Sequence, residues 1–365
     1  MSRIARGIVG TALLGMIGMQ MISVAPADAA PSMVTVRGWS ALYRAFTTAS
    51  PGTTTKIVLG KNITAPTWKS LWIPTNLGVG GAKVLFDLNG HNLSITQSTC
   101  AGITVNVGAS LEIKDSKGSG VLTAVGEEWC PGIGAADDAR VADLNHSNMG
   151  TIIIDSGTVI ATGGDGASGL GGSYYFAGGK ITINGGNVFA TGGSEAPGIG
   201  NGWDAEYATS GMKITINGGN VNAVGGSNAS GIGWSALSRR TGSAIHVGGC
   251  ANITAKGGVG GTGFENDITG AGAGIGGGAA SMSNSSPTPV IAAPRLLIDG
   301  IPAPGAATTG ASGSSFDTGL GRLDGAPGSP ITYSGNAKYV IKATATTPGA
   351  GLLGGLFVLT CTQQI

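Results

Sequence analysis

Short stretches of alternating apolar and polar residues recur through the middle of the chain. Residues 180–193, with the sequence KITINGGNVFATGG, return almost unchanged as residues 213–226, KITINGGNVNAVGG. In the first copy Ile181 and Ile183 fall on one side of the segment and Thr182 falls on the other. A period of two residues is typical of β-strands. Because a second alternating segment follows the glycine pair, each copy predicts two short strands joined by a glycine turn.

Looser copies of the same pattern occupy residues 111–126, 151–164 and 244–258. Aligning the copies predicts two inward rows in the second strand, one aliphatic and one of alanine: Leu122, Val159, Val188, Val221 and Ile253, then Ala124, Ala161, Ala190, Ala223 and Ala255. Repetition of like residues at like positions is the mark of stacked structural repeats.

A third short element follows each pair of strands, and it begins with a glycine before Ile or Leu. These glycines are Gly102, Gly132, Gly169, Gly198, Gly231 and Gly274, at spacings of 30, 37, 29, 33 and 43 residues. Three short strands in about 30 residues describe one coil of a parallel β-helix, in which equivalent strands stack about 4.8 Å apart. We therefore predict an all-β fold, a β-solenoid, and we expect right-handed winding because parallel crossovers prefer that hand.

Two other interpretations of a glycine-rich chain were considered. A disordered chain would not keep this alternation, and a β-sandwich gives no reason for a sequence repeat every 30 residues or so. The chain holds 69 glycines and only 11% charged residues, but 41% of it is hydrophobic, enough to fill a ladder of aliphatic side chains. The net charge of +1 offers no overall basic field, so we expect no nucleic-acid partner.

The two ends of the repeat array differ from its middle. Residues 30–95 are assigned to an N-terminal cap and the first coils, with a short helix at residues 39–48 that covers the open end. Residues 96–300 form the β-helix repeats, residues 301–330 a Gly/Ala/Ser/Pro-rich loop or linker, and residues 331–365 C-terminal strands.

Residues 1–29 have the organisation of a secretory signal peptide. Arg3 and Arg6 precede an apolar stretch at residues 7–24, and Ala27 and Ala29 have the spacing of a cleavage site. A retained membrane anchor is the alternative, because the apolar stretch is close to spanning length. The small residues of the cleavage site favour removal. We expect a secreted, extracellular protein, free or associated with the cell surface, with no transmembrane segment after cleavage.

Several phrases resemble repeat regions of secreted and cell-surface proteins of Gram-positive bacteria, which are similar to the pectate-lyase-like β-helix superfold. They are ITINGGNVFATGG (residues 181–193), GAGIGGG (272–278), FDLNGHNL (86–93) and LEIKDS (111–116). The resemblance covers roughly residues 34–300. It implies the fold and an extracellular setting, but the superfold carries lyases, hydrolases, adhesins and glycan binders alike.

No recognisable catalytic site is present in the sequence. The densest charged cluster, Asp137, Asp138 and Arg140, falls in one loop, and its two carboxylates are weak candidates for a metal or acid–base site. The alternative is a solvated loop tip. We therefore predict no catalytic residue, no metal and no cofactor, while an enzymatic role stays open.

Aromatic residues cluster in the loops after the Gly-Ile steps. The candidate glycan-binding residues are Tyr174, Tyr175, Trp203, Tyr207 and Trp234. Flat rings spaced along a rod suit the sugar rings of a polymer, and loops on a rigid scaffold often carry function. Alternatively, each ring packs over its own loop as a lid. Alanine at Trp203 and Trp234 separates the two: glycan binding predicts weaker affinity, and the lid predicts a lower melting temperature.

The four cysteines predict two disulfides. Cys100 and Cys130 occupy equivalent positions before successive Gly-Ile steps, and stacked positions in adjacent coils lie about 5 Å apart, within disulfide range. Cys250 and Cys361 then pair by elimination. Export permits their oxidation.

These observations favour a non-enzymatic surface or secreted β-helix for adhesion or polysaccharide binding, with a polysaccharide or the surface of a host or neighbouring cell as partner. A polysaccharide lyase or glycoside hydrolase of the same superfold is the alternative. A structural envelope or stalk component is the second alternative.

Overall fold

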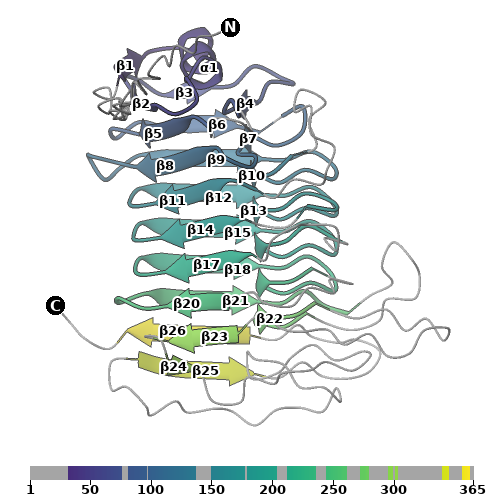
Figure 1. Ribbon diagram of the computed structural model, residues 1–365. Helices are drawn as coiled ribbons and strands as arrows, with labels where there is room; N and C mark the ends of the chain where they lie inside the picture. Colours follow the sequence, from purple (N-terminus) through teal and green to yellow (C-terminus); the bar gives the residue numbers. More distant parts are fainter. Residues whose placement is uncertain are drawn as a thin grey trace, which may run out of the picture. The chain divides into compact units, whose positions relative to one another are not determined.

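The protein is a parallel β-solenoid with one short N-terminal helix (Figure 1). The computed structural model describes residues 32–75, 81–96, 98–136, 149–176, 179–203, 212–235, 244–260, 272–278, 295–298, 301–302, 339–344 and 356–361. The predicted signal peptide (1–29) and the predicted linker (301–330), apart from residues 301–302, lie outside these residues.

Each coil contributes one strand to each of three sheets, so that chain neighbours such as β8, β9 and β10 belong to different sheets. Sheet A consists of β1 (Ser32–Val36), β2 (Thr54–Leu59), β5 (Lys83–Asp87), β8 (Ser110–Lys114), β11 (Thr151–Ile154), β14 (Lys180–Ile183), β17 (Lys213–Ile216), β20 (Ala244–Val247), β23 (Arg295–Ile298) and β24 (Ile301–Pro302). A coil takes about 31 residues, which confirms the predicted period.

The other two sheets continue the same stacking. Sheet B consists of β3 (Ile63–Thr64), β6 (Leu93–Ile95), β9 (Val121–Val125), β12 (Thr158–Thr162), β15 (Asn187–Thr191), β18 (Asn220–Val224), β21 (Asn252–Lys256), β26 (Leu356–Cys361) and β25 (Tyr339–Thr344). Sheet C consists of β4 (Leu71–Trp72), β7 (Ile103–Thr104), β10 (Ile133–Gly134), β13 (Leu170–Gly171), β16 (Ile199–Gly200), β19 (Ile232–Gly233) and β22 (Ile275–Gly276).

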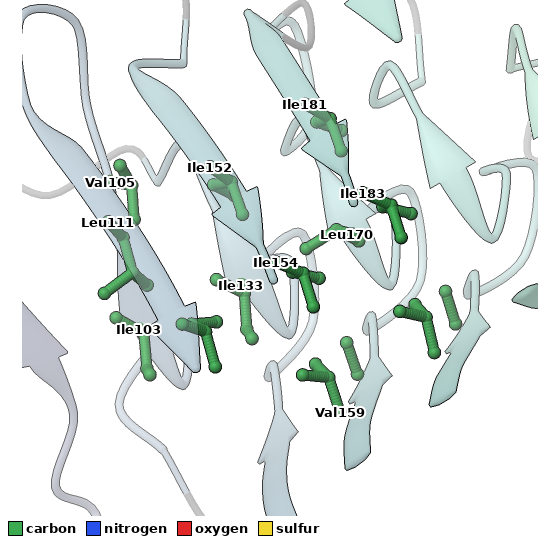
Figure 2. Packing of buried hydrophobic residues seen from close by; sticks show 14 of the residues in the cluster. Ile103, Val105, Leu111, Ile133, Ile152, Ile154, Val159, Leu170, Ile181 and Ile183 are labelled. Atoms are coloured by element: carbon green, nitrogen blue, oxygen red, sulfur yellow. The ribbon is translucent and has the colours of Figure 1, made fainter. Parts of the chain in front are cut away.

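The core is a set of aliphatic ladders inside the coils. Ile152 pairs in register with Leu111 on one side and with Ile181 on the other, and all three side chains are fully buried. Figure 2 shows these residues of sheet A facing Ile133 and Leu170 of sheet C. The predicted rows of sheet B also stack in register, which confirms the alignment. Burying such a side chain contributes roughly 1.5–3 kcal/mol, so repetition accumulates stability coil by coil.

Glycine gives the corner of sheet C its tight stacking. Gly134, Gly171, Gly200, Gly233 and Gly276 occupy one register position in successive coils. Gly171 has φ +144°, and a Cβ there would overlap the carbonyl oxygen of Gly200 in the next coil. Only a residue without a side chain combines this backbone conformation with so close an approach.

The helix α1 (Trp39–Thr47) packs on the first coils, within the residues predicted for it. Leu42 and Phe46 are fully buried, and the Phe46 ring meets the ring of Phe86 edge-on with centroids 5.4 Å apart. The helix therefore adds apolar side chains to the N-terminal end of the core.

The opposite end of sheet B is closed by an antiparallel hairpin. Strand β26 pairs antiparallel with β21, and β25 pairs antiparallel with β26. Reversal of strand direction stops the parallel stacking at this edge, and a disulfide between Cys250 and Cys361 ties the hairpin to the last coils.

Both predicted disulfides are present. Cys100 and Cys130 join adjacent coils with their Cα atoms 5.1 Å apart, and Cys250 and Cys361 lie 5.3 Å apart. Disulfides persist in oxidising compartments, so the pair indicates an extracytoplasmic environment. Within the described part of the chain, no helix is both long and apolar enough to cross a membrane.

Replacing both Cys100 and Cys130 with serine is expected to lower the free energy of unfolding by about 3 kcal/mol, because the bond closes a loop of 30 residues in the unfolded chain. Denaturant unfolding of the double variant measures this. Peptide mapping without reduction provides the control: free thiols at both positions in the native protein would contradict the pairing and the coil alignment together.

Candidate functional site

The structure divides the predicted glycan-binding aromatics into buried and partly exposed residues. Trp203 and Trp234 are 5% and 1% exposed, and Trp234 belongs to the hydrophobic core. Tyr174 and Tyr175 are half-buried, and Tyr207 lies outside the described residues. A sugar ring cannot stack on an indole that the protein already covers. Their role in binding stays a prediction, but the burial of both tryptophans favours the lid interpretation for them.

Three of the loop aromatics pack against one another across coils. The Trp129 and Tyr174 rings meet edge-on with centroids 4.7 Å apart, and Tyr174 stacks on Trp203 at 4.9 Å. The Trp129 indole lies over Gly166 of the next coil, where a Cβ would collide with it. These rings therefore connect successive coils, and such pairs stabilise by about 0.5–1.5 kcal/mol beyond the area they bury.

The predicted charged cluster of Asp137, Asp138 and Arg140 lies outside the described residues. Among the residues that are described, no group of three or more His, Cys, Asp or Glu side chains is arranged to hold a metal ion.

A different feature has the geometry of a binding site: a groove of about 540 Å³ between α1 and the turns that lead into sheet C. We call it the helix groove. Its lining residues come from α1, from the loop between β3 and β4 and from the loop between β6 and β7: Trp39, Ser40, Tyr43, Arg44, Thr47, Trp68, Lys69, Ser70 and Thr99. Aromatic rings, hydroxyl groups and two cations thus converge on one open depression.

Trp68 is the most accessible of these rings. It is 58% exposed, and its backbone has φ +58°, a left-handed conformation that is an outlier for a bulky residue. Trp129 has a similar φ of +66° in the turn before β10, but there the neighbouring coil covers the ring. In the following coil, Thr99 lines the same groove as Trp68 with a small side chain. The indole is therefore held in a costly turn and left open to solvent.

Contacts with the rest of the protein hold several other side chains of the helix groove in place. Trp39 and Tyr43 lie one helical turn apart with ring centroids separated by 6.3 Å, and both pack against the core. Ser70 Oγ lies 3.0 Å from Thr99 Oγ1 and accepts a hydrogen bond from the Thr99 backbone N–H. The disulfide at Cys100 fixes the residue beside Thr99. The hydroxyl groups and rings are thus preorganised by three elements of the fold.

Comparisons with family models, with curated proteins and with solved structures find no match.

A smaller depression, of about 250 Å³, lies on the outer face of sheet A. Glu112 lines it together with Lys83. Burial and the neighbouring Asp155, with which Glu112 shares a hydrogen bond, raise the pKa of Glu112, while Lys114 opposes the shift. Acid–base hydrolysis needs two neighbouring carboxylates, so Glu112 and Asp155 are where an enzymatic activity would be sought among the described residues.

The helix groove was not predicted from the sequence, where capping was the one role assigned to residues 39–48. One signal was available: Trp68 stands shortly before a sheet C strand, in the same part of its coil as Trp129. Extending the repeat into the first coil would have predicted the position of Trp68, but not the other walls of the groove.

Proposed function

We propose that this protein is an extracellular β-solenoid that binds a polysaccharide at the helix groove without cleaving it, in the service of adhesion. The observation that carries the proposal is the exposed ring of Trp68, 58% accessible, which lines one groove with the rings of Trp39 and Tyr43 and with the hydroxyl pair of Ser70 and Thr99.

The chemistry of this lining suits a sugar chain. The apolar face of a pyranose ring packs on an indole, while its hydroxyl groups exchange hydrogen bonds with hydroxyl, guanidinium and ammonium groups. The volume of about 540 Å³ falls inside the range of about 300–1,000 Å³ that is common for ligand sites. An open groove, rather than a closed cavity, admits the interior of a polymer as well as its end.

The resemblance of the repeats to secreted and wall-associated proteins of Gram-positive bacteria supports an envelope setting, and the two disulfides support export. A rigid stack of coils also suits a protein that holds its terminal site away from a surface. The fold by itself supports no particular chemistry.

Incubation with a panel of insoluble polysaccharides tests the proposal. We expect retention of the protein on at least one polymer, with no release of reducing or unsaturated ends. Release that disappears in Glu112→Gln would establish the carboxylate pair on sheet A as a catalytic site and replace binding by hydrolysis or elimination. A failure to be retained by any polymer would overturn the proposal.

Trp68→Ala is expected to weaken binding to the retained polymer about 5-fold or more, because an aromatic contact of this kind contributes about 1 kcal/mol or more. The melting temperature should stay close to that of the native protein, since the ring is 58% exposed. Isothermal titration with a soluble fragment measures the affinity.

Phe189→Ala is the matched control, because Phe189 is 45% exposed on the outer face of sheet B, away from the helix groove. Its affinity should equal that of the native protein. Equal losses in the two variants would mean that any exposed ring serves, and unchanged affinity in Trp68→Ala would move the site elsewhere.

A further inference from the structure

We propose that the ligand of the helix groove is an anionic polysaccharide, a sugar polymer that carries carboxylate, phosphate or sulfate groups. The inference rests on the proposed function and adds the charge of the substrate to it.

The basis is a charge asymmetry that the overall net charge of +1 conceals. No Asp or Glu occurs from residue 31 to residue 86, and Asp87 is the first acidic residue of the solenoid. The same stretch carries six cations: Arg37, Arg44, Lys56, Lys61, Lys69 and Lys83. The N-terminal end of the solenoid is therefore basic, and the remainder of the chain supplies the compensating negative charge.

Two of these cations line the helix groove itself. Arg44 projects from the last turn of α1 and Lys69 follows Trp68, and both side chains are exposed. Among the residues that the structure describes, no Asp or Glu lines the groove. Within the described residues the single ion pair joins Lys114 to Asp87, so neither Arg44 nor Lys69 has a carboxylate partner there.

Arg44 also borders a second groove beside α1, of about 550 Å³, and none of the described residues that line it is acidic. Arginine binds carboxylate and phosphate groups through two parallel N–H donors, and lysine binds them as a point charge. The helix dipole alone favours a cation in the last turn of a helix, which would explain Arg44. It does not explain Lys69 or the lack of Asp and Glu between residues 31 and 86.

An anionic sugar polymer fits this combination better than other polyanions. The exposed indole and the Ser70–Thr99 hydroxyl pair provide the contacts that a pyranose uses. Nucleic acid is not the expected partner in the oxidising compartment that the disulfides indicate. An anionic membrane would engage the cations but would give the rigid, hydroxyl-lined groove no specific occupant.

A dextran series with one backbone tests the charge requirement: unmodified, carboxymethylated, phosphorylated and sulfated dextran, measured by affinity electrophoresis. We expect the acidic forms to bind at least 10-fold more tightly than unmodified dextran, with binding that weakens as salt rises from about 50 to 500 mM. The preferred acid group distinguishes a uronate-like from a phosphate- or sulfate-bearing ligand. Equal affinity across the series, or retention only by neutral polymers of the panel, would overturn the inference and leave the proposed function intact.

The double variant Arg44→Gln/Lys69→Gln should lose most of the preference for acidic dextran and most of its salt dependence. Its control is Lys213→Gln/Lys256→Gln, which removes the same charge from two exposed lysines in β17 and β21. Equal losses in both variants would show a diffuse charge effect and contradict a site in the groove. Equally tight binding of phosphatidylglycerol vesicles or polyadenylate would also contradict it, because the protein would then be a general polyanion binder.

Discussion

Gly171→Ala is expected to lower the free energy of unfolding by more than about 4 kcal/mol, enough to unfold part of the solenoid at ambient temperature. The added Cβ would overlap the carbonyl oxygen of Gly200 in the next coil, at a φ of +144° that alanine rarely adopts. The oxygen that the Cβ would meet belongs to the backbone of a stacked strand, so relief of the overlap requires separating β13 from β16. Thermal unfolding followed by circular dichroism measures the effect.

Gly118→Ala is the matched control. Gly118 has φ +82°, but a Cβ there would meet nothing within 4 Å. The Gly118→Ala variant should therefore lose only the free energy needed to hold alanine at a positive φ, about 1–2 kcal/mol. Similar losses at the two positions would contradict the close stacking of sheet C.

Trp234→Ala is expected to cost about 3–5 kcal/mol in stability and to leave polysaccharide affinity unchanged. Its side chain is 1% exposed and belongs to the core, and its backbone is fixed on both sides. The Trp234 N–H donates to Gly276 O at 2.9 Å, and the Ser230 hydroxyl donates to Trp234 O at 2.8 Å. Removing the indole leaves a large cavity inside a rigid frame that cannot collapse to fill it.

For Trp68→Ala we expect the opposite result: weaker binding of the polysaccharide and an unchanged melting temperature. Differential scanning calorimetry and titration on both variants therefore separate anchoring from binding. Weaker binding by a still-stable Trp234→Ala would restore the original expectation that the loop rings of the later coils form the glycan face.

The fold was predictable because each coil of a solenoid places similar residues at equivalent positions, which appears in the sequence as a repeat. Every coil buries the same two rows, so Ile181 and Ile214 repeat in the sequence as they stack in space. The equivalence of Cys100 and Cys130 followed from the same alignment. The bounds of α1 were also accessible, because Leu42 and Phe46 lie four residues apart on one helical face.

The helix groove was not predictable in the same way. Its walls come from α1 and from loops of two different coils, so no period links Tyr43, Trp68 and Thr99. The burial of Trp203 and Trp234 was equally inaccessible, because a sequence pattern does not tell whether a loop ring faces solvent or folds back on its neighbours. Repetition specified the scaffold, and the parts that break the repetition carry the candidate site.

Hydroxyl-radical footprinting of the protein, with and without its retained polysaccharide, tests the central claim most directly. The account predicts that oxidation of Trp68 and Trp39 falls when the polymer is bound, while Phe189, on sheet B, is oxidised to the same extent. Protection of Tyr174 and Tyr175 with unchanged oxidation of Trp68 would contradict it and place binding on the loops of the later coils.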